Sequence, residues 1–360
     1  MKSEDIKSEN IKEEQRTDTE SGEIVLEVRN LRTHLFTKRG VVRAVDGVNL
    51  FLRAGETLGI VGESGSGKTM TAKSILRMEP KPAGKIVDGE IILNGRDIVG
   101  KSEKEMRWIR GREISMILQD PQTSLNPVYT VGNQILEGVQ IHQKDKDKAS
   151  LKNRVLQVLK QVNVAAPEQR LKDYPHQMSG GMKQRVVGSI AISSYPQVII
   201  ADEPTTSLDL TIQAQYLRLL KRIQAETGAA MIFITHDFGI VAKMCDRVAV
   251  MYAGRMVEEG GVREIFNNPS HPYTHALINS VPKVERRVER LFSIPGQPPA
   301  LWQEIKGCPF APRCEYADDR CQREYPSSFR GLSGDAEHKA DCWRLEDENW
   351  KPKPFSGYTE

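Results

Sequence analysis

Residues 57–69 read TLGIVGESGSGKT, a short apolar run followed by a glycine-rich loop that ends in Lys-Thr. The run Thr57–Val61 predicts a buried β-strand, and the residues from Thr69 to about Arg77 are compatible with a helix. A loop of this composition between a strand and a helix is typical of phosphate binding, because its amide groups and the helix N-terminus converge on one anion. The predicted phosphate-binding residues are Gly62, Glu63, Ser64, Gly65, Ser66, Gly67, Lys68 and Thr69. We expect Lys68 to bind the β and γ phosphates of ATP and the Thr69 hydroxyl to coordinate Mg²⁺.

A second short strand, Val198–Ala201, is followed by two carboxylates, Asp202 and Glu203. Ligands of α/β proteins bind at the carboxyl ends of the strands, so these acids are expected beside the phosphate loop. Asp202 suits the binding of Mg²⁺ or its water shell, and Glu203 suits the general base that polarises an attacking water. A pair that merely begins a helix is the competing interpretation, and the phosphate loop upstream makes it the weaker one.

Composition and charge argue against several other classes of protein. The 360 residues are 28% charged and 39% apolar, as in an ordinary globular protein, and the formal net charge of +3 lacks the strongly basic footprint of a dedicated nucleic-acid binder. No stretch approaches the roughly 18–20 consecutive apolar residues needed to span a bilayer, and the N-terminus lacks the layout of a secretory signal. We therefore expect the chain in the cytoplasm.

The pattern along the chain predicts a multipart α/β protein. Residues 1–22 form a charged, disordered tail, and residues 23–268 form an α/β domain with a mostly parallel sheet, interrupted at about 120–180 by a helical subdomain. From residue 269 to 360 prolines, cysteines and turn residues become frequent, which predicts a separate C-terminal module. The expected strands are Ile24–Val28, Thr57–Val61, Ile114–Leu118, Val198–Ala201 and Met231–Ile234.

Residues 174–185 read YPHQMSGGMKQR and resemble the signature sequence of ABC transporter ATPases. The resemblance implies a P-loop NTPase fold of the ABC type, with an inserted helical subdomain and an antiparallel β edge, and head-to-tail pairing of two such domains. Ser179, Gly180, Gly181 and Met182 would then close over the γ phosphate held by the other subunit. A helix N-terminus at Ser179 forms a second anion cradle. Met182 replaces the family's usual glutamine, as in the peptide-importer branch.

The resemblance also implies roles for further residues, which occur along this sequence in the same order as in the family. Gln119, after the strand Ile114–Leu118, is similar to the glutamine that senses magnesium and communicates with the membrane domains. Ser207 and Asp209 are similar to the loop that crosses the dimer interface, and His236 is similar to the histidine that contacts the γ phosphate. A lone histidine after a strand is more often structural, but the position of His236 in this order favours the catalytic role. Phe36 is the candidate for stacking on adenine, with residues 39–42 as the alternative.

Other segments resemble the ATPases of oligopeptide and dipeptide importers. These segments are residues 119–127 (QDPQTSLNP), 201–215, 271–274 (HPYT) and 294–299 (IPGQPP). The resemblance implies four partners at the cytoplasmic membrane: a second, homologous but different ATPase, two integral membrane permease subunits and an extracytoplasmic peptide-binding protein. It also implies that this chain lies at the cytoplasmic face of that membrane. Importers of nickel or other small solutes share much of the pattern and remain an alternative.

Four of the five cysteines, Cys308, Cys314, Cys321 and Cys342, gather near the C-terminus. A reducing cytoplasm argues against disulfides, so a metal site is considered. In the resembling branch this segment is cysteine-rich, and four thiolates are the ligands of a 4Fe–4S cluster. Zinc and free structural thiols stay open, because the spacing matches neither a zinc ribbon nor a ferredoxin.

Two other functions compete with that of an importer motor. A soluble ABC ATPase that acts on nucleic acid usually carries tandem cassettes or long coiled coils, whereas this sequence has one phosphate loop and no sustained heptads. A regulatory module without turnover would lack a general base, and Glu203 is present. The sequence therefore predicts ATP hydrolysis coupled to transport.

Overall fold

The computed structural model describes residues 22–142, 147–206, 208–281 and 292–353. The tail expected at residues 1–22 lies outside the described residues except for Gly22. Within these four ranges, none of the helices combines the length and the apolar character needed to cross a bilayer.

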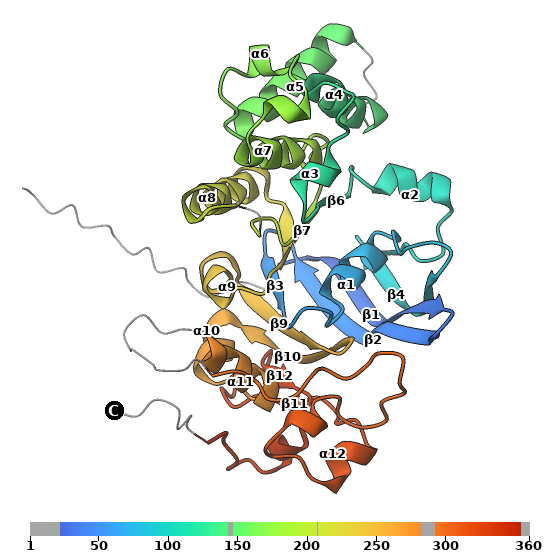
Figure 1. The fold of residues 1–360 in the computed structure, drawn as a ribbon, viewed down its shortest axis with the longest axis vertical. Coiled ribbons are helices and arrows are strands. Elements are labelled where there is room, and N and C mark those ends of the chain that lie inside the picture. Colours follow the sequence, from blue (N-terminus) through green and yellow to red (C-terminus); the bar gives the residue numbers. More distant parts are fainter. Residues whose placement is uncertain (1–21, 143–146, 207, 282–291, 354–360) are drawn as a thin grey trace, which may run out of the picture.

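The centre of the molecule is an eight-stranded sheet in the order β11-β12-β10-β9-β3-β8-β7-β6 (Figure 1). Strands β9, β3, β8, β7 and β6 run parallel, and β10, β12 and β11 continue the sheet antiparallel. The predicted α/β class is confirmed. The strands are β3 (Thr57–Val61), β6 (Ile114–Ile117), β7 (Val198–Asp202), β8 (Ala230–Ile234), β9 (Arg247–Tyr252), β10 (Arg255–Gly261), β11 (Phe329–Arg330) and β12 (Lys339–Ala340).

A second sheet of four antiparallel strands, in the order β2-β1-β4-β5, forms the expected antiparallel part. The strand expected at Ile24–Val28 is only the beginning of β1, because alternation of buried and exposed side chains continues to the hairpin, where Thr37 pairs with Gly40. The strands are β1 (Ile24–Thr37), β2 (Gly40–Arg53), β4 (Gly84–Leu93) and β5 (Arg96–Asp97).

Both faces of the central sheet are covered, as in most parallel sheets. On β8, Ile232 and Ile234 pack into a core shared with the second sheet and α1, whereas Met231 and Phe233 pack into a core with α4, α5, α7 and α8 on the other face. Helix α1 is thus enclosed between the two sheets. The helices outside the insertion are α1 (Lys68–Ile75), α2 (Glu103–Ile109), α8 (Leu210–Thr227), α9 (Phe238–Met244), α10 (Val262–Asn267), α11 (Pro272–Ser280) and α12 (Asp319–Arg323).

Helices occupy the chain between β6 and β7 and lie above the central sheet in Figure 1. Apolar residues spaced by four, such as Ile135 and Val139 on α4 or Val155 and Leu159 on α5, are buried against α7 and α8. The elements are α3 (Pro121–Ser124), α4 (Val131–His142), α5 (Lys148–Gln161), α6 (Pro167–Arg170), the 3-10 turn η1 (Pro175–Gln177) and α7 (Gly180–Ala191).

The C-terminal region lies below the sheet in Figure 1 and extends it. Strand β12 pairs with β10, where Glu258 lies opposite Ala340. The Glu258 carboxylate is fully buried and accepts hydrogen bonds from the backbone amides of Ser270 and His271, and His338 Nε2 lies 2.8 Å from its Oε1. The sheet therefore crosses the domain boundary expected at residue 269. Two further 3-10 turns are η2 (Ala311–Arg313) and η3 (Trp343–Glu346).

We predict that His338→Ala lowers the free energy of unfolding by about 3 kcal/mol, because a fully buried carboxylate loses one of its partners. Chemical denaturation measures the change. Glu337→Ala is the control, since the Glu337 side chain is 48% exposed and its ion pair with Arg53 is expected to contribute less than about 1 kcal/mol. Equal effects of the two substitutions would contradict the assignment of His338 to the buried network.

Candidate functional site

The phosphate loop connects β3 to α1 and is held in shape by its own lysine. Lys68 is 5% exposed, and its Nζ donates to the carbonyl oxygens of Gly62 (2.8 Å) and Glu63 (2.9 Å). Burial lowers the pKa of Lys68, while the carboxylates of Glu203, Asp202 and Glu63 act in the opposite direction. An ammonium group in this position can bind phosphate oxygens without moving far. The loop and its cation therefore form one preorganised anion site.

Two glycines of the loop occupy positions that no other residue fits. Gly62 has φ 152° and Gly67 has φ 111°, a region that side chains rarely adopt. A Cβ atom on Gly62 would lie 2.1 Å from the Met251 carbonyl oxygen, and one on Gly67 would lie 2.4 Å from that of Ala44. The loop is therefore pressed against the backbone of β9 and β2.

The ends of four parallel strands bring the predicted catalytic residues together. Gln119 follows β6, Asp202 ends β7, and His236 follows β8, and these strands are successive neighbours on one side of β3. The Glu203 carboxylate accepts from Gln119 Nε2 (3.0 Å) and Thr206 Oγ1 (3.0 Å), and its Oε1 lies 3.4 Å from His236 Nδ1. Gln119 and His236, which are distant from Glu203 in sequence, and Thr206, three residues after it, thus surround one carboxylate.

Glu203 adopts a left-handed backbone conformation, with φ 44°. A non-glycine residue in this region is strained, and such strain gathers at functional sites. The Glu203 amide donates to the Ile234 carbonyl (2.9 Å), which holds the residue against β8 despite the turn. This turn directs the chain away from the sheet directly after Asp202.

Two of the predicted metal ligands, Asp202 and Thr69, are in direct contact. Thr69 Oγ1 donates to Asp202 Oδ1 (3.1 Å), and Asp202 is 2% exposed. Burial raises the pKa of Asp202, although the hydrogen bond from Thr69 acts against it. In the described part of the chain, no three or more His, Cys, Asp or Glu side chains are grouped as in a metal site. Mg²⁺ needs no such group, because it is usually held by one or two protein oxygens, waters and the phosphates.

The predicted signature residues lie at a helix tip. Ser179 is the N-cap of α7, and its side chain accepts from the Met182 amide (3.4 Å). Ser179 and Gly180 are exposed, and Gly181 and Met182 are partly buried. In Figure 1, α7 lies among the upper helices, apart from α1 and its phosphate loop. The tip is therefore open to contact from outside this chain.

The remaining sequence-predicted residues are peripheral to this cluster. Asp209 caps α8 by accepting from the amides of Thr211 (3.1 Å) and Ile212 (3.0 Å), whereas Ser207 lies outside the described residues. Phe36 is 46% exposed near the end of β1, with Lys85 Nζ 5.6 Å from its ring centre. One face of that ring can receive a base, but its role stays a prediction.

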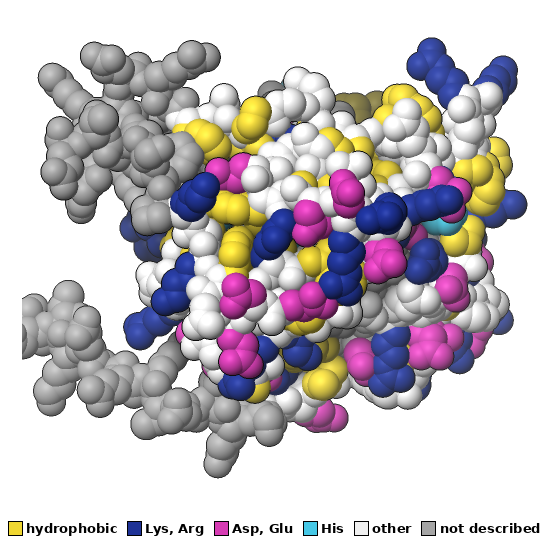
Figure 2. Space-filling view, turned by 90° about the horizontal axis from the view of Figure 1, so that it is seen from below, with side chains coloured by type: hydrophobic (Ala, Val, Ile, Leu, Met, Phe, Trp, Pro, Cys, Tyr) yellow, Lys and Arg dark blue, Asp and Glu magenta, His cyan; other side chains and the backbone are white. Residues whose placement is uncertain are grey.

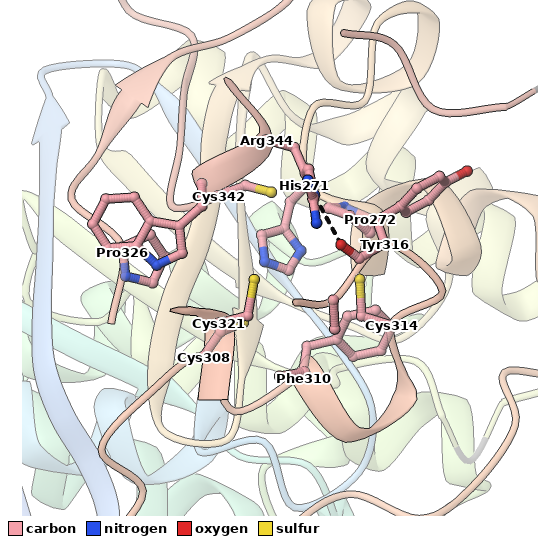
Figure 3. A pocket seen from close by; sticks show the side chains of 13 residues that line it. His271, Pro272, Cys308, Phe310, Cys314, Tyr316, Cys321, Pro326, Cys342 and Arg344 are labelled. Carbon is pink, nitrogen blue, oxygen red and sulfur yellow. Dashed lines mark hydrogen bonds between the residues drawn. The ribbon is translucent and has the colours of Figure 1, made fainter. Parts of the chain in front are cut away.

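The four C-terminal cysteines line one small cavity of about 20 Å³, together with His271, Phe310 and Arg344. Figure 3 shows the side chains of Cys314, Cys321 and Cys342 pointing into the same space. Burial raises the pKa of Cys308 and of Cys342 to about 12, and that of Cys314 to about 11. In the absence of a bound cation these thiols are therefore neutral at physiological pH.

Sequence reasoning missed two residues that contact the phosphate loop. Tyr273 Oη accepts from the Glu63 amide (2.8 Å), and Arg313 binds both carboxylate oxygens of Glu63. Tyr273 lies in the HPYT segment, and Arg313 lies in the cysteine-rich segment, directly before Cys314. Nothing in the spacing of those segments indicated that they would reach the nucleotide site.

Comparison with known families gives two matches. Residues 45–206 match the family model described as ABC transporter, and residues 257–321 match the one described as the C-terminal region of oligopeptide/dipeptide transporters. The first match contains the phosphate loop, Asp202 and Glu203, and the second contains Tyr273 and Arg313. Both groups of residues around Glu63 thus lie in recognised family regions.

Curated proteins are similar over nearly the whole chain. A probable peptide ABC transporter ATP-binding protein of Sinorhizobium fredii is 50% identical over 89% of this chain and 95% of its own length. The dipeptide transport ATP-binding protein DppD of Bacillus subtilis is 48% identical over 93% of this chain and 98% of its own. The oligopeptide transport ATP-binding protein OppD of the same organism is 47% identical, with 92% and 91% coverage.

Solved structures are similar over about two thirds of the chain. The ATP-binding cassette MJ0796, in a dimeric post-hydrolysis state with ADP and Pi, has a TM-score of 0.59 at 26% identity and covers 66% of this chain and 99% of its own. The protein cbiO1 of Clostridium perfringens, part of the complex cbiONQ, has a TM-score of 0.58 at 28% identity, with 68% and 91% coverage.

We predict that Gly67→Ala destabilises the nucleotide-free protein more than Gly65→Ala. Both residues have positive φ, which costs an alanine roughly 1–2 kcal/mol, but only Gly67 faces a backbone atom, whereas the space around Gly65 is open. Denaturant unfolding without nucleotide measures both. Equal losses of stability in the two variants would contradict the close approach of Gly67 to the Ala44 carbonyl.

Proposed function

The chain belongs to the oligopeptide/dipeptide branch of the ABC transporter ATP-binding proteins, and on this premise we propose how its residues bind and hydrolyse ATP to power peptide import. The family and fold predicted from the motif order are confirmed by the similarities above. One observation carries the catalytic proposal. The Glu203 carboxylate is surrounded by Gln119, Thr206 and His236, at the same edge of the sheet as the phosphate loop.

ATP binding is assigned to the loop from Gly62 to Thr69. The buried Lys68 ammonium faces the β and γ phosphates, and the backbone amides of the loop and of the first turn of α1 donate to their oxygens. Thr69 and Asp202, which already share a hydrogen bond, would hold Mg²⁺ with Gln119. When bound, the ion neutralises charge on the phosphates.

Hydrolysis is assigned to Glu203 as the general base that orients the attacking water. Its carboxylate receives hydrogen bonds from Gln119 and Thr206, so one oxygen is held while the other faces His236. His236 has a 60% exposed side chain, which is available for contact with the γ phosphate. Phosphoryl transfer depends mainly on positioning and electrostatics, which these contacts supply.

A second ATPase subunit completes the site in this proposal. The exposed tip of α7, with Ser179, Gly180 and Gly181 followed by Met182, would close over the γ phosphate held by the partner. Ser207 and Asp209 would cross the interface, and the adjacent Leu210 supports this because it is 83% exposed. The similar cassette MJ0796 was solved as a dimer. We propose a heterodimer with a homologous ATPase.

The remaining partners follow from the transport role. Two membrane permease subunits and an extracytoplasmic peptide-binding protein would complete the importer, with this chain peripheral at the cytoplasmic face. The names of the similar proteins refer to peptides, dipeptides and oligopeptides, which favours these cargoes over nickel. Basic and acidic side chains are interspersed on the face shown in Figure 2, and this face offers no basic tract for nucleic acid.

The four C-terminal cysteines are proposed to hold a 4Fe–4S cluster with a structural role. Four thiols on one cavity are the donor set of such a cluster, whose iron would stabilise their thiolate forms. Among the described residues these thiols do not form a ready-made metal site, and the cavity is small, so cluster binding requires them to rearrange. Zinc and a set of free thiols are the alternatives.

We predict that Glu203→Gln retains ATP binding but lowers kcat on the order of 10²-fold or more, since a carboxamide cannot accept the proton of the attacking water. With its correct partner subunit, the variant is expected to trap a closed, ATP-bound dimer. Phosphate release and size-exclusion chromatography measure the two effects. Normal phosphate release would exclude Glu203 as the base.

We predict that protein purified without oxygen contains about four iron and four sulfide per chain. Cys342→Ser should remove this iron, whereas Cys245→Ser, at a cysteine that does not line the cavity, should retain it. Metal analysis and visible absorbance test the idea. Zinc in place of iron, or neither metal, would reject the cluster.

A further inference from the structure

Arg313 connects the C-terminal region directly to the phosphate loop. It ends η2, immediately before Cys314, and its side chain is only 5% exposed. Its Nη1 donates to Glu63 Oε2 (2.7 Å), and its Nη2 donates to Glu63 Oε1 (3.0 Å). Such a bidentate pair fixes orientation as well as distance, because the planar guanidinium matches the carboxylate.

The guanidinium group is itself held from three sides. Its Nε donates to the Pro295 carbonyl (2.9 Å), its Nη2 to the Ile294 carbonyl (3.4 Å) and its Nη1 to Tyr252 Oη (3.1 Å). The hydrogen bonds to Glu63 raise the pKa of Arg313 further above its already high value. A cation with this many fixed partners has little freedom to leave Glu63.

The backbone of Glu63 is hydrogen-bonded both to Lys68 of the loop and to Tyr273 of the C-terminal region. Its carbonyl oxygen accepts from Lys68 Nζ, the predicted phosphate ligand, and its amide donates to Tyr273 Oη. Tyr273 is fully buried in α11, and its ring lies 4.5 Å from that of Tyr252 and 5.3 Å from that of Phe310. The position of Lys68 is therefore linked through Glu63 to a packed cluster of aromatic rings from β9 and the C-terminal region.

The segment beside Arg313 also reaches the opposite wall of the loop. Beyond Ile294 and Pro295, the Leu301 carbonyl accepts from the Arg43 amide on β2 (3.0 Å). Ala44, the next residue, has the carbonyl oxygen that approaches Gly67 of the loop. The C-terminal region thus contacts the phosphate loop at Glu63 and the strand against which the loop is pressed.

We propose that Arg313 is a positioning residue of the ATP site, which holds Glu63 and thereby preforms the phosphate loop for ATP. The inference rests on the proposed function and adds the C-terminal region to the determinants of ATP affinity. Arg313 touches neither Glu203 nor its hydrogen-bond partners in the described contacts, so its loss weakens binding more than chemistry. A loop that is not preformed must be ordered at the cost of binding energy.

The test uses the full chain in its transporter complex, with Arg313→Gln, Glu63→Gln and the double variant. We expect each single substitution to raise the KM for ATP about tenfold, the equivalent of a charge-assisted hydrogen bond, while kcat changes less than about twofold. The double variant should be no worse than either single variant, because both remove the same pair. Arg313→Lys should recover only part of the affinity, since an ammonium cannot bind both oxygens in the same way.

Arg320→Gln is the matched control. Arg320 lies in the same region and pairs with Glu346 (2.7 Å), but its ion pairs and ring contact lie within the C-terminal region, so KM is expected to stay unchanged. Additive effects of the Arg313 and Glu63 substitutions would overturn the proposal. So would a lower kcat and melting temperature with unchanged KM, the pattern of a purely structural ion pair.

A binding measurement separates this inference from the proposed function. ATP affinity is titrated in the Glu203→Gln background, where turnover is not required. If the wild-type complex fails to hydrolyse ATP, the proposed function fails, and the titration still tests Arg313. If the wild-type complex hydrolyses ATP and Arg313→Gln leaves the affinity unchanged, only the inference about Arg313 fails.

Discussion

The negative charge of a triphosphate has to be balanced by groups at one edge of a parallel sheet. The arrangement of the chain follows from that requirement. Strands β3, β8, β7 and β6 are parallel neighbours, so the residues that follow them reach the same edge. There Lys68 is buried near Asp202 and Glu203, whose carboxylates favour its charged form, whereas the two carboxylates repel each other. Without this common edge, the phosphate loop would bind anions but would have no base and no metal ligand beside it.

This edge also contains backbone and charge features that constrain its residues. Gly62 and Gly67 are pressed onto neighbouring backbone, Glu203 adopts a left-handed conformation, and Asp202 is a buried carboxylate whose pKa is raised. The left-handed conformation of Glu203 and the burial of Asp202 oppose folding, whereas Gly62 and Gly67 fit where a Cβ atom would not. Stability given up in this way is typical of sites that are preorganised for binding and catalysis.

The C-terminal region is part of this packing. Strand β12 extends the central sheet through β10, and the buried Glu258 and His338 join the two segments. The aromatic rings of Tyr252, Tyr273 and Phe310 continue the contact to the phosphate loop. Phe310 also lines the four-cysteine cavity, so one ring contacts both that cavity and Tyr273, whose hydroxyl accepts from the Glu63 amide.

The sequence by itself determined the α/β class, the phosphate loop, the carboxylates of β7 and the family, because these depend on local order: a strand, a turn of glycines, a helix, and polar residues directly after apolar runs. It also placed Gln119 and His236 at strand ends. Only the tertiary structure decided that β1 is a long strand of a separate sheet, that the C-terminal region shares the main sheet, and that Tyr273 and Arg313 reach Glu63. Arg313 and Glu63 are 250 residues apart in the chain, and a contact of that separation has no periodicity or spacing to reveal it. It arises when strands and aromatic rings pack, which is a property of the whole fold.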